Sequence, residues 1–150
     1  MPSVKDLMTE FVITVDLHRP LLDAVTLMKE KRVGCLVVLD NDDPVGIITE
    51  RDLVRRVLAE RLPLETRVSE VMSKPLITVE PDSPLSSAAK LMVKNKIRRL
   101  PVAEGSRLVG IIVASDFAQH LSKDTVTEEV LDVVARYSPA ALTPILARAL

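Results

Sequence analysis

Short apolar runs alternate with amphipathic stretches along the chain. Three runs in the first half predict short strands, at residues 13–15, 36–39 and 45–48. Between the first two, apolar residues at i, i+3 and i+4 spacing predict a helix of about a dozen residues. This helix is expected to begin at Pro20, because proline suits the first helical position. A second amphipathic helix is predicted from Glu50 to about Glu60.

The polar residues between these runs predict how the elements connect. Residues 40–44, Asp-Asn-Asp-Asp-Pro, are a turn signal, so the runs on either side are expected to pair as a β-hairpin. The second helix is expected to bury a stripe of four aliphatic side chains, Leu53, Val54, Val57 and Leu58. The predicted order of elements in the first half is therefore β-α-β-β-α, and residues 61–67 are predicted to form a linker.

The second half of the chain is a copy of the first. A shift of 64 residues aligns residues 4–53 with 68–117 without a gap, and 17 of the 50 aligned positions are identical. One copy alone would bury too little surface on folding to have a large free energy of unfolding. The sequence predicts a mixed α+β fold with two repeats, 4–60 and 68–122, packed sheet to sheet with pseudo-twofold symmetry. Residues 123–150 have no counterpart and are predicted to be a C-terminal helical extension.

This extension is expected to contain two helical segments. Thr125, three residues before Glu128, can cap a helix. Its apolar face would be formed by Val126, Val130, Val133, Val134 and Tyr137. A second apolar face follows Ser138-Pro139 and consists of Leu142, Ile145, Leu146, Ala149 and Leu150. Two hypotheses stay open: the extension packs on its own module, or its last helix contacts a second subunit or a client protein.

Composition narrows the class of protein. The 150 residues contain 20 Lys+Arg and 21 Asp+Glu, so no basic excess favours nucleic-acid binding. Three aromatic residues are too few for a single-strand stacking platform. The single cysteine, Cys35, excludes an intrachain disulfide and fits a reducing compartment. With no signal peptide and no apolar run near the ~20 residues of a membrane span, we expect a soluble cytoplasmic protein without membrane or nucleic-acid partners.

A carboxylate follows the last strand of each repeat at the start of a helix. In the first repeat this is Asp52, within Gly46-Ile-Ile-Thr-Glu-Arg-Asp, and in the second it is Asp116. First-turn backbone N–H groups have no intrahelical partner, so donors and an acid occur side by side. Such a place suits a sugar diol and a phosphate. Thr49 and Asp52 also form a capping box, and the two roles are not exclusive.

The chain resembles a tandem pair of CBS domains, a Bateman module, over residues 4 to about 122. The motifs that carry the resemblance are the two Ile-Thr-Val triplets at 13–15 and 77–79, the Leu-x-Val strands at 36–38 and 100–102, and Gly-Ile-Ile-Thr-x-x-Asp at 46–52. The resemblance implies binding of an adenosyl ligand, such as AMP, ADP, ATP or S-adenosylmethionine, in clefts between the repeats. It also implies a regulatory role and a homodimer.

The resemblance also implies two sets of ligand-binding residues. The first cleft would be formed by Thr49, Arg51, Asp52, Ile77, Thr78, Ile97, Arg98, Arg99 and Pro101. Its adjacent arginines would suit a phosphate, because Arg forms forked charge-assisted hydrogen bonds. A weaker second cleft would be formed by Ile13, Thr14, Val33, Gly34, Cys35, Ile111, Val113 and Asp116. There Val113 replaces the hydroxyl and Gly34-Cys35 replace the arginines, so a less charged ligand, or none, is expected.

No catalytic or metal-ligating constellation is recognised in the sequence. It contains no nucleophile–base pair and no phosphate-binding loop, and His18 and His120 lack neighbouring ligands. We therefore expect a regulatory module that transmits ligand occupancy to a partner, is not an enzyme, and requires no cofactor or metal. The alternatives are a dimerisation scaffold with empty clefts and an enzyme acting on nucleotides.

Overall fold

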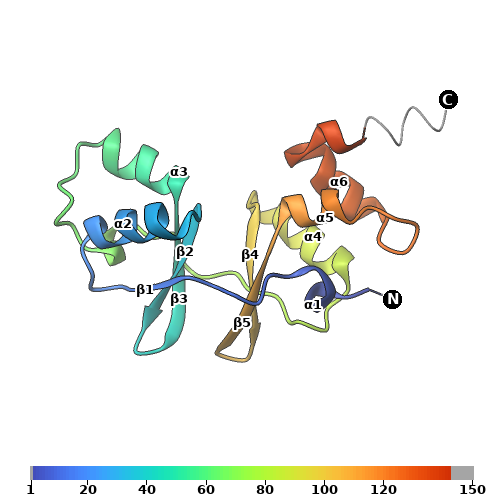
Figure 1. Ribbon diagram of the computed structural model, residues 1–150, viewed down its shortest axis with the longest axis horizontal. Helices are drawn as coiled ribbons and strands as arrows, with labels where there is room; N and C mark the ends of the chain where they lie inside the picture. Colours follow the sequence, from blue (N-terminus) through green and yellow to red (C-terminus); the bar gives the residue numbers. More distant parts are fainter. Residues whose placement is uncertain (1, 143–150) are drawn as a thin grey trace. The chain divides into compact units, whose positions relative to one another are not determined.

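The chain folds into two compact units of mixed α+β structure, as the sequence predicts. The computed structural model describes residues 2–142. The first unit consists of Val12–Ile77, and the second unit is formed by the residues before and after that segment. Each unit is built on a β-hairpin followed directly by a helix (Figure 1).

The first unit contains a three-stranded sheet. Its elements are β1 (Thr14–Asp16), α2 (Leu21–Lys31), β2 (Cys35–Asp40), β3 (Asp43–Thr49), α3 (Glu50–Asp52), a π-helix (Leu53–Leu58) and a 3₁₀ turn (Val68–Glu70). The strand order is β1-β2-β3, with β1 parallel and β3 antiparallel to β2. α2 begins at Leu21 rather than at Pro20, because Pro20 has the extended backbone of an N-cap, with ψ at 155°.

The predicted hairpin and its turn are confirmed. Asp40 and Asp43 are paired at the end of the ladder, which leaves a two-residue loop. Both loop residues, Asn41 and Asp42, have positive φ, at 48° and 69°. Asn and Asp tolerate this left-handed conformation better than other side chains do, so the polar turn sequence sets the hairpin connection.

The predicted buried stripe of the second helix is confirmed for two of its four residues. Only Val57 is buried, whereas Leu53 is partly buried and Val54 and Leu58 are 56% and 69% exposed. The helix continues beyond α3 as a π-helix, in which the N–H of Ala59 bonds to the carbonyl of Val54, five residues earlier. A π-helix has a wider turn than an α-helix. Residues four apart still lie on one side of this helix, Leu53 with Val57 towards the core and Val54 with Leu58 towards solvent, so the helix buries only half of the predicted stripe.

The second unit repeats the hairpin but has a smaller sheet. Its elements are α1 (Val4–Leu7), α4 (Leu85–Asn95), β4 (Arg99–Glu104), β5 (Arg107–Val113), α5 (Ala114–Gln119), α6 (Glu128–Tyr137) and a 3₁₀ turn (Pro139–Leu142). β4 and β5 are antiparallel and form a two-stranded sheet. The repeat predicts a further strand at 77–79, but there Val79 forms only an isolated parallel bridge with Val102.

The N-terminal segment packs in the second unit, although in the sequence it opens the first repeat. The N–H of Val4 bonds to the carbonyl of Ser83 at 3.0 Å. Thr9 and Ile111 then exchange two backbone hydrogen bonds, each 2.9 Å long, so the segment after α1 adds to the edge of β5.

The first unit shows the same arrangement 64 residues later. The N–H of Val68 bonds to the carbonyl of Arg19 at 2.9 Å, and Ser73 exchanges hydrogen bonds with Ile47 on β3. The segment that opens each sequence repeat therefore docks on the hairpin of the other repeat. The packing units are offset from the sequence repeats by this exchange.

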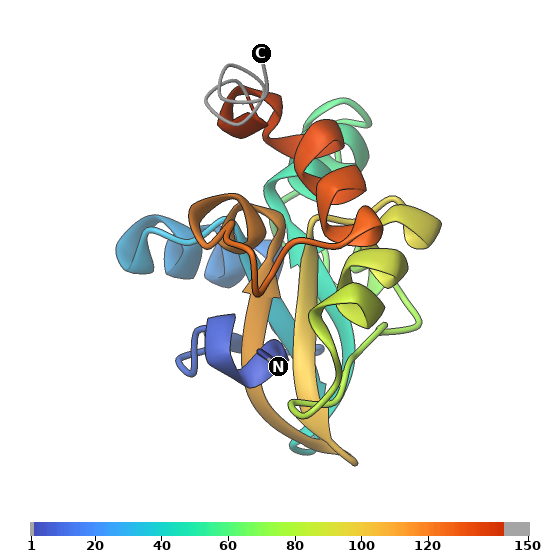
Figure 2. The ribbon, with the colours of Figure 1, turned by 90° about the vertical axis from the view of Figure 1, so that its right-hand side faces the viewer.

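The described part of the C-terminal extension, up to Leu142, packs in its own unit. α6 lies beside α4 and α5 (Figure 2), and Val130, Val133 and Val134 on it are fully buried. This confirms the hypothesis of packing on its own module for α6. The second apolar face was predicted for Leu142, Ile145, Leu146, Ala149 and Leu150, and all but Leu142 lie outside the described residues.

The cap of α6 is Thr127, not Thr125 as predicted. The Thr127 hydroxyl accepts from the N–H of Val130 at 3.2 Å, as an N-cap side chain does. Thr125 is instead buried in the preceding turn, where its hydroxyl donates to the carbonyl of His120 at 2.6 Å and accepts from the N–H of Ser122. Thr125 and Thr127 have the same capping chemistry, and the packing of the chain determines which of them is the cap.

We expect Gly46→Ala to destabilise the protein by about 1–3 kcal/mol through overpacking. An added Cβ would lie 2.8 Å from the sulfur of Met72 and 2.9 Å from the carbonyl oxygen of Ser73, and the backbone oxygen cannot easily yield. Chemical denaturation measures the change. The control Ser106→Ala, in an exposed turn, should change the free energy of unfolding by less than about 0.5 kcal/mol. Equal stabilities for the two variants would contradict close packing at this glycine.

Candidate functional site

Thr49 and Asp52 form a capping box where β3 passes into α3. The Oδ2 atom of Asp52 accepts from the N–H of Thr49 at 3.0 Å, and the Thr49 hydroxyl accepts from the N–H of Asp52 at 3.2 Å. The Asp52 residue is only 8% exposed. The predicted capping role is confirmed, and it fixes an acceptor-only group at the N-terminal end of a helix.

The other carboxylate oxygen of Asp52 has partners from its own unit. Its Oδ1 atom accepts from the hydroxyl of Ser73 at 3.1 Å, and the Nε atom of Arg56 lies 3.7 Å away. An ionised carboxylate offers about four acceptor sites. A sugar diol that reached Asp52 would share these sites with the Thr49 and Ser73 groups, or displace the Ser73 hydroxyl.

Asp116 occupies the equivalent place at the start of α5 in the second unit. Its Oδ2 atom accepts from the N–H of Val113 at 2.8 Å. Burial raises the pKa of Asp116, although the hydrogen bond from Val113 and the nearby charge of His120 act in the opposite direction. Since Val113 has no hydroxyl, this copy lacks the polar side chain that Thr49 provides in the first unit.

Within each unit, the loop before the core strand lies against the first turn of the helix. The N–H of Glu50 bonds to the carbonyl of Gly34 at 3.0 Å, and the N–H of Ala114 bonds to the carbonyl of Arg98 at 2.8 Å. The first unit thus brings Gly34 to Asp52, and the second brings Arg98 to Asp116. The two clefts predicted from the sequence each combine residues of both units, so those groupings stay predictions.

The remaining predicted residues differ in how accessible they are. Arg51, Thr78 and Arg98 are exposed, and Pro101 is buried in β4. The partly buried members of the two sets are Ile13, Thr14, Val33, Gly34, Cys35, Ile77, Ile97, Arg99, Ile111 and Val113. The exposed Arg51, Thr78 and Arg98 and the partly buried Arg99 keep polar groups accessible to solvent.

One contact of Arg98 is not predicted by the sequence. The guanidinium carbon lies over the ring of Tyr137, 6.0 Å from its centroid, which is a cation–π arrangement. Tyr137 is the last residue of α6 and is separated from Arg98 by 39 positions in the chain. The sequence places Tyr137 on the apolar face of α6, but it does not predict which residue the ring contacts.

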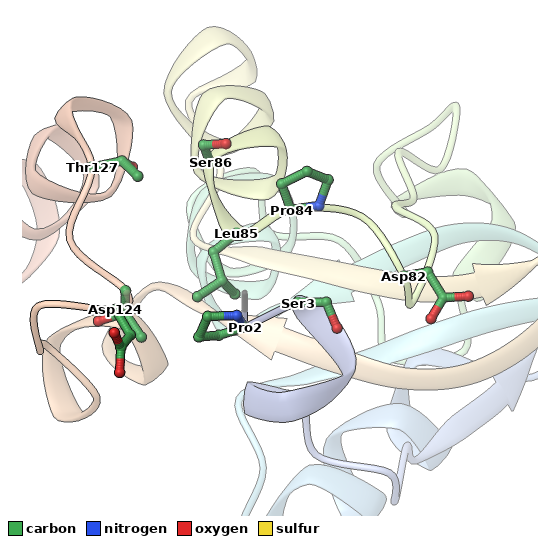
Figure 3. A pocket seen from close by; sticks show the side chains of 9 residues that line it. Pro2, Ser3, Asp82, Pro84, Leu85, Ser86, Asp124 and Thr127 are labelled. Atoms are coloured by element: carbon green, nitrogen blue, oxygen red, sulfur yellow. The ribbon is translucent and has the colours of Figure 1, made fainter.

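A small cavity lies between the N-terminal ends of α4 and α6 in the second unit. It has a volume of about 130 Å³, and Asp82 and Asp124 lie at its opposite ends with Leu85 and Pro2 between them (Figure 3). Ligand pockets for drug-sized molecules usually occupy roughly 300–1,000 Å³. This cavity is too small for an adenosyl compound, and it contains none of the residues predicted to bind one.

Two further observations concern residues 2–142. No group of three or more His, Cys, Asp or Glu side chains is placed there to hold a metal ion. None of the helices in this part of the chain combines the length and the apolar character needed to cross a bilayer.

Comparisons with known proteins agree with the duplicated architecture. The CBS-domain model matches residues 4–59 and 68–123. The chain is 40% identical over 118 residues to the CBS domain-containing protein YhcV of Bacillus subtilis, covering 79% of this chain and 84% of that protein. It is 31% identical over 144 residues to Hypoxic response protein 1 of Mycobacterium tuberculosis, covering 95% and 99%.

The fold also matches solved structures. The hexameric CBS-CP12 protein from bloom-forming cyanobacteria superposes with a TM-score of 0.76 and 33% sequence identity, and the match covers 99% of this chain and 91% of that one. Together with the two matched segments, these similarities mean that the chain belongs to the CBS-domain family and carries two CBS domains in tandem.

Proposed function

We propose that this tandem CBS protein is a regulatory module that binds an adenosyl ligand, such as AMP, ADP, ATP or S-adenosylmethionine. The observation that carries the proposal is the buried carboxylate of Asp52, fixed beside the Thr49 hydroxyl in the first turn of a helix. A carboxylate in this position can accept hydrogen bonds from both hydroxyls of a ribose.

In this proposal Arg98 and Arg99 bind the phosphate. Both are available for this role, since Arg98 is exposed and Arg99 only partly buried. Arg51, Ile77, Thr78, Ile97 and Pro101 complete the predicted ligand contacts. The second cleft, with Asp116 and without the Thr49 hydroxyl, takes a less charged adenosyl compound or stays empty.

Occupancy of the site would be transmitted to a partner rather than used for chemistry. A ligand shifts a conformational equilibrium only as far as its affinities for the two states differ. The proposed role is therefore allosteric, in the cytoplasm, with no required cofactor and no reaction on the nucleotide. Small molecules carried through purification and identified by mass would name the ligand, and incubation with ATP followed by product analysis would detect an enzymatic role.

We also propose that the protein forms a homodimer through exposed apolar side chains of the first unit. Leu22 on α2 and Val54 and Leu58 on the π-helix are 51%, 56% and 69% exposed. Val54 and Leu58 are four residues apart on one helix, and neighbouring apolar side chains exposed on a surface commonly mark protein–protein contacts. The hexameric state in the name of the cyanobacterial relative supports self-association in this family.

For the ribose contact, we expect Asp52→Asn to weaken AMP binding at least about tenfold. Hydrogen bonds to charged groups are worth roughly 1.5–3 kcal/mol, and an amide keeps the shape of the side chain without its charge. Calorimetric titration measures the change in Kd. The matched control Asp116→Asn should have a smaller effect on AMP, and an unchanged Kd in Asp52→Asn would refute the assignment of the ribose site.

For the phosphate contact, we expect AMP to bind more tightly than adenosine, with a difference that added salt reduces. Salt screens the attraction between the phosphate and the exposed guanidinium of Arg98. Arg98→Met and Arg99→Met should each reduce the difference, whereas the control Arg107→Met, at the exposed start of β5, should leave it intact. Equal affinities for AMP and adenosine at low salt would show that the arginines do not bind phosphate.

For the dimer, we expect Leu58→Glu to shift the protein towards monomer. Each large apolar side chain fully buried at an interface supplies about 1.5–3 kcal/mol, so a charge at this position should raise the dimer Kd about tenfold or more. Light scattering over a dilution series measures the equilibrium. The control Val126→Glu, at a 42% exposed position in the second unit, should leave the dimer unchanged. Dimerisation of Leu58→Glu as tight as that of the wild type would exclude this surface.

A further inference from the structure

The contact between Arg98 and Tyr137 joins a predicted ligand-binding residue to the C-terminal helix. Arg98 lies just before β4, and Tyr137 ends α6, with 6.0 Å between the guanidinium carbon and the ring centroid. The ring is held on a well-anchored helix, because α6 packs on α4 and α5 through the fully buried Val130, Val133 and Val134. Tyr137 itself is only partly buried, and Arg98 is exposed.

This arrangement leaves the hydrogen-bonding groups of Arg98 available. A cation–π contact uses the charge of the guanidinium and none of its hydrogen bonds, and Arg98 is exposed, so its five N–H donors stay accessible to solvent. These donors are what a phosphate needs for forked recognition. An exposed arginine without such support samples many rotamers, and ordering a rotamer-rich side chain opposes binding. The contact with Tyr137 already restricts the Arg98 side chain, so less conformational entropy is lost when the ligand binds.

We propose that Tyr137 is a positioning residue, which orders the Arg98 side chain to receive the phosphate of the bound nucleotide. This inference rests on the proposed function, in which Arg98 contacts phosphate, and it adds α6 to the binding apparatus. Because coupling between two sites is reciprocal, a phosphate bound to ordered Arg98 also stabilises the docked position of the end of α6. The C-terminal extension thereby reports whether a phosphorylated ligand is bound.

The contact can first be tested without any ligand. Tyr137 is the only tyrosine and the chain has no tryptophan, so the near-ultraviolet circular dichroism in the tyrosine region reports this ring. Arg98→Met should change this signal, and the neighbouring control Arg99→Met should leave it unchanged. An unchanged signal in Arg98→Met would overturn the stacking contact, and with it the inference.

The role in binding is tested by titrating AMP and adenosine into the wild type, Tyr137→Leu and Tyr137→Phe. Tyr137→Leu should weaken AMP about two- to fivefold, which is the worth of a cation–π contact at an exposed site, and leave adenosine unchanged. Tyr137→Phe keeps the ring and should bind both as the wild type does. In the Arg98→Met background, Tyr137→Leu should have no further effect on AMP.

The possible results separate this inference from the proposed function. If the wild type binds neither AMP nor adenosine, the assignment of this site to an adenosine phosphate fails and the role of Tyr137 fails with it. If the wild type prefers AMP but Tyr137→Leu binds it equally well, only the inference is overturned. Equal losses for AMP and adenosine, or an additive loss in the double variant, would also overturn it, because they would indicate a structural role of Tyr137 that does not pass through Arg98.

Discussion

The close docking of one chain segment on each hairpin is the constraint on which the two units depend. At Gly46, and again at Gly110, the backbone of the segment that opens the other repeat approaches so closely that a Cβ would lie within 3 Å of a carbonyl oxygen. Only glycine leaves this space. Because Ser73 and Thr9 also bond to β3 and β5 there, the docking ties each hairpin to a segment distant in sequence.

The same hairpins position the candidate site. β3 ends at Thr49 and β5 at Val113, and in each unit a helix starts at the next residue with a carboxylate at its third position. The capping hydrogen bonds hold that carboxylate rigidly, which is what recognition of a sugar diol requires. The structural role and the proposed binding role of Asp52 therefore support each other, but they also compete, because Thr49 and Ser73 already use part of its acceptor capacity.

The two units have diverged most where their helices meet solvent. In the second unit α6 covers α4 and α5, whereas in the first unit Val54 and Leu58 stay exposed on a π-helix. In the second unit α6 thus covers the neighbouring helices. In the first unit the π-helix leaves its apolar side chains accessible to solvent. The two proposals follow this difference, with self-association placed at the first unit and a phosphate-linked response of α6 at the second.

The sequence alone determined the repeat, the hairpins and the Thr49–Asp52 cap, because local spacing and turn chemistry govern all three. Tertiary structure decided the rest. The exchanged opening segments depend on contacts between residues far apart in the chain, such as Thr9 and Ile111, which local patterns do not encode. The spacing rule predicted burial of Val54 and Leu58, but packing leaves this side of the π-helix exposed to solvent. Thr127 rather than Thr125 caps α6, and Tyr137 contacts Arg98. Both follow from the packing of whole helices, because this packing determines which side chains meet.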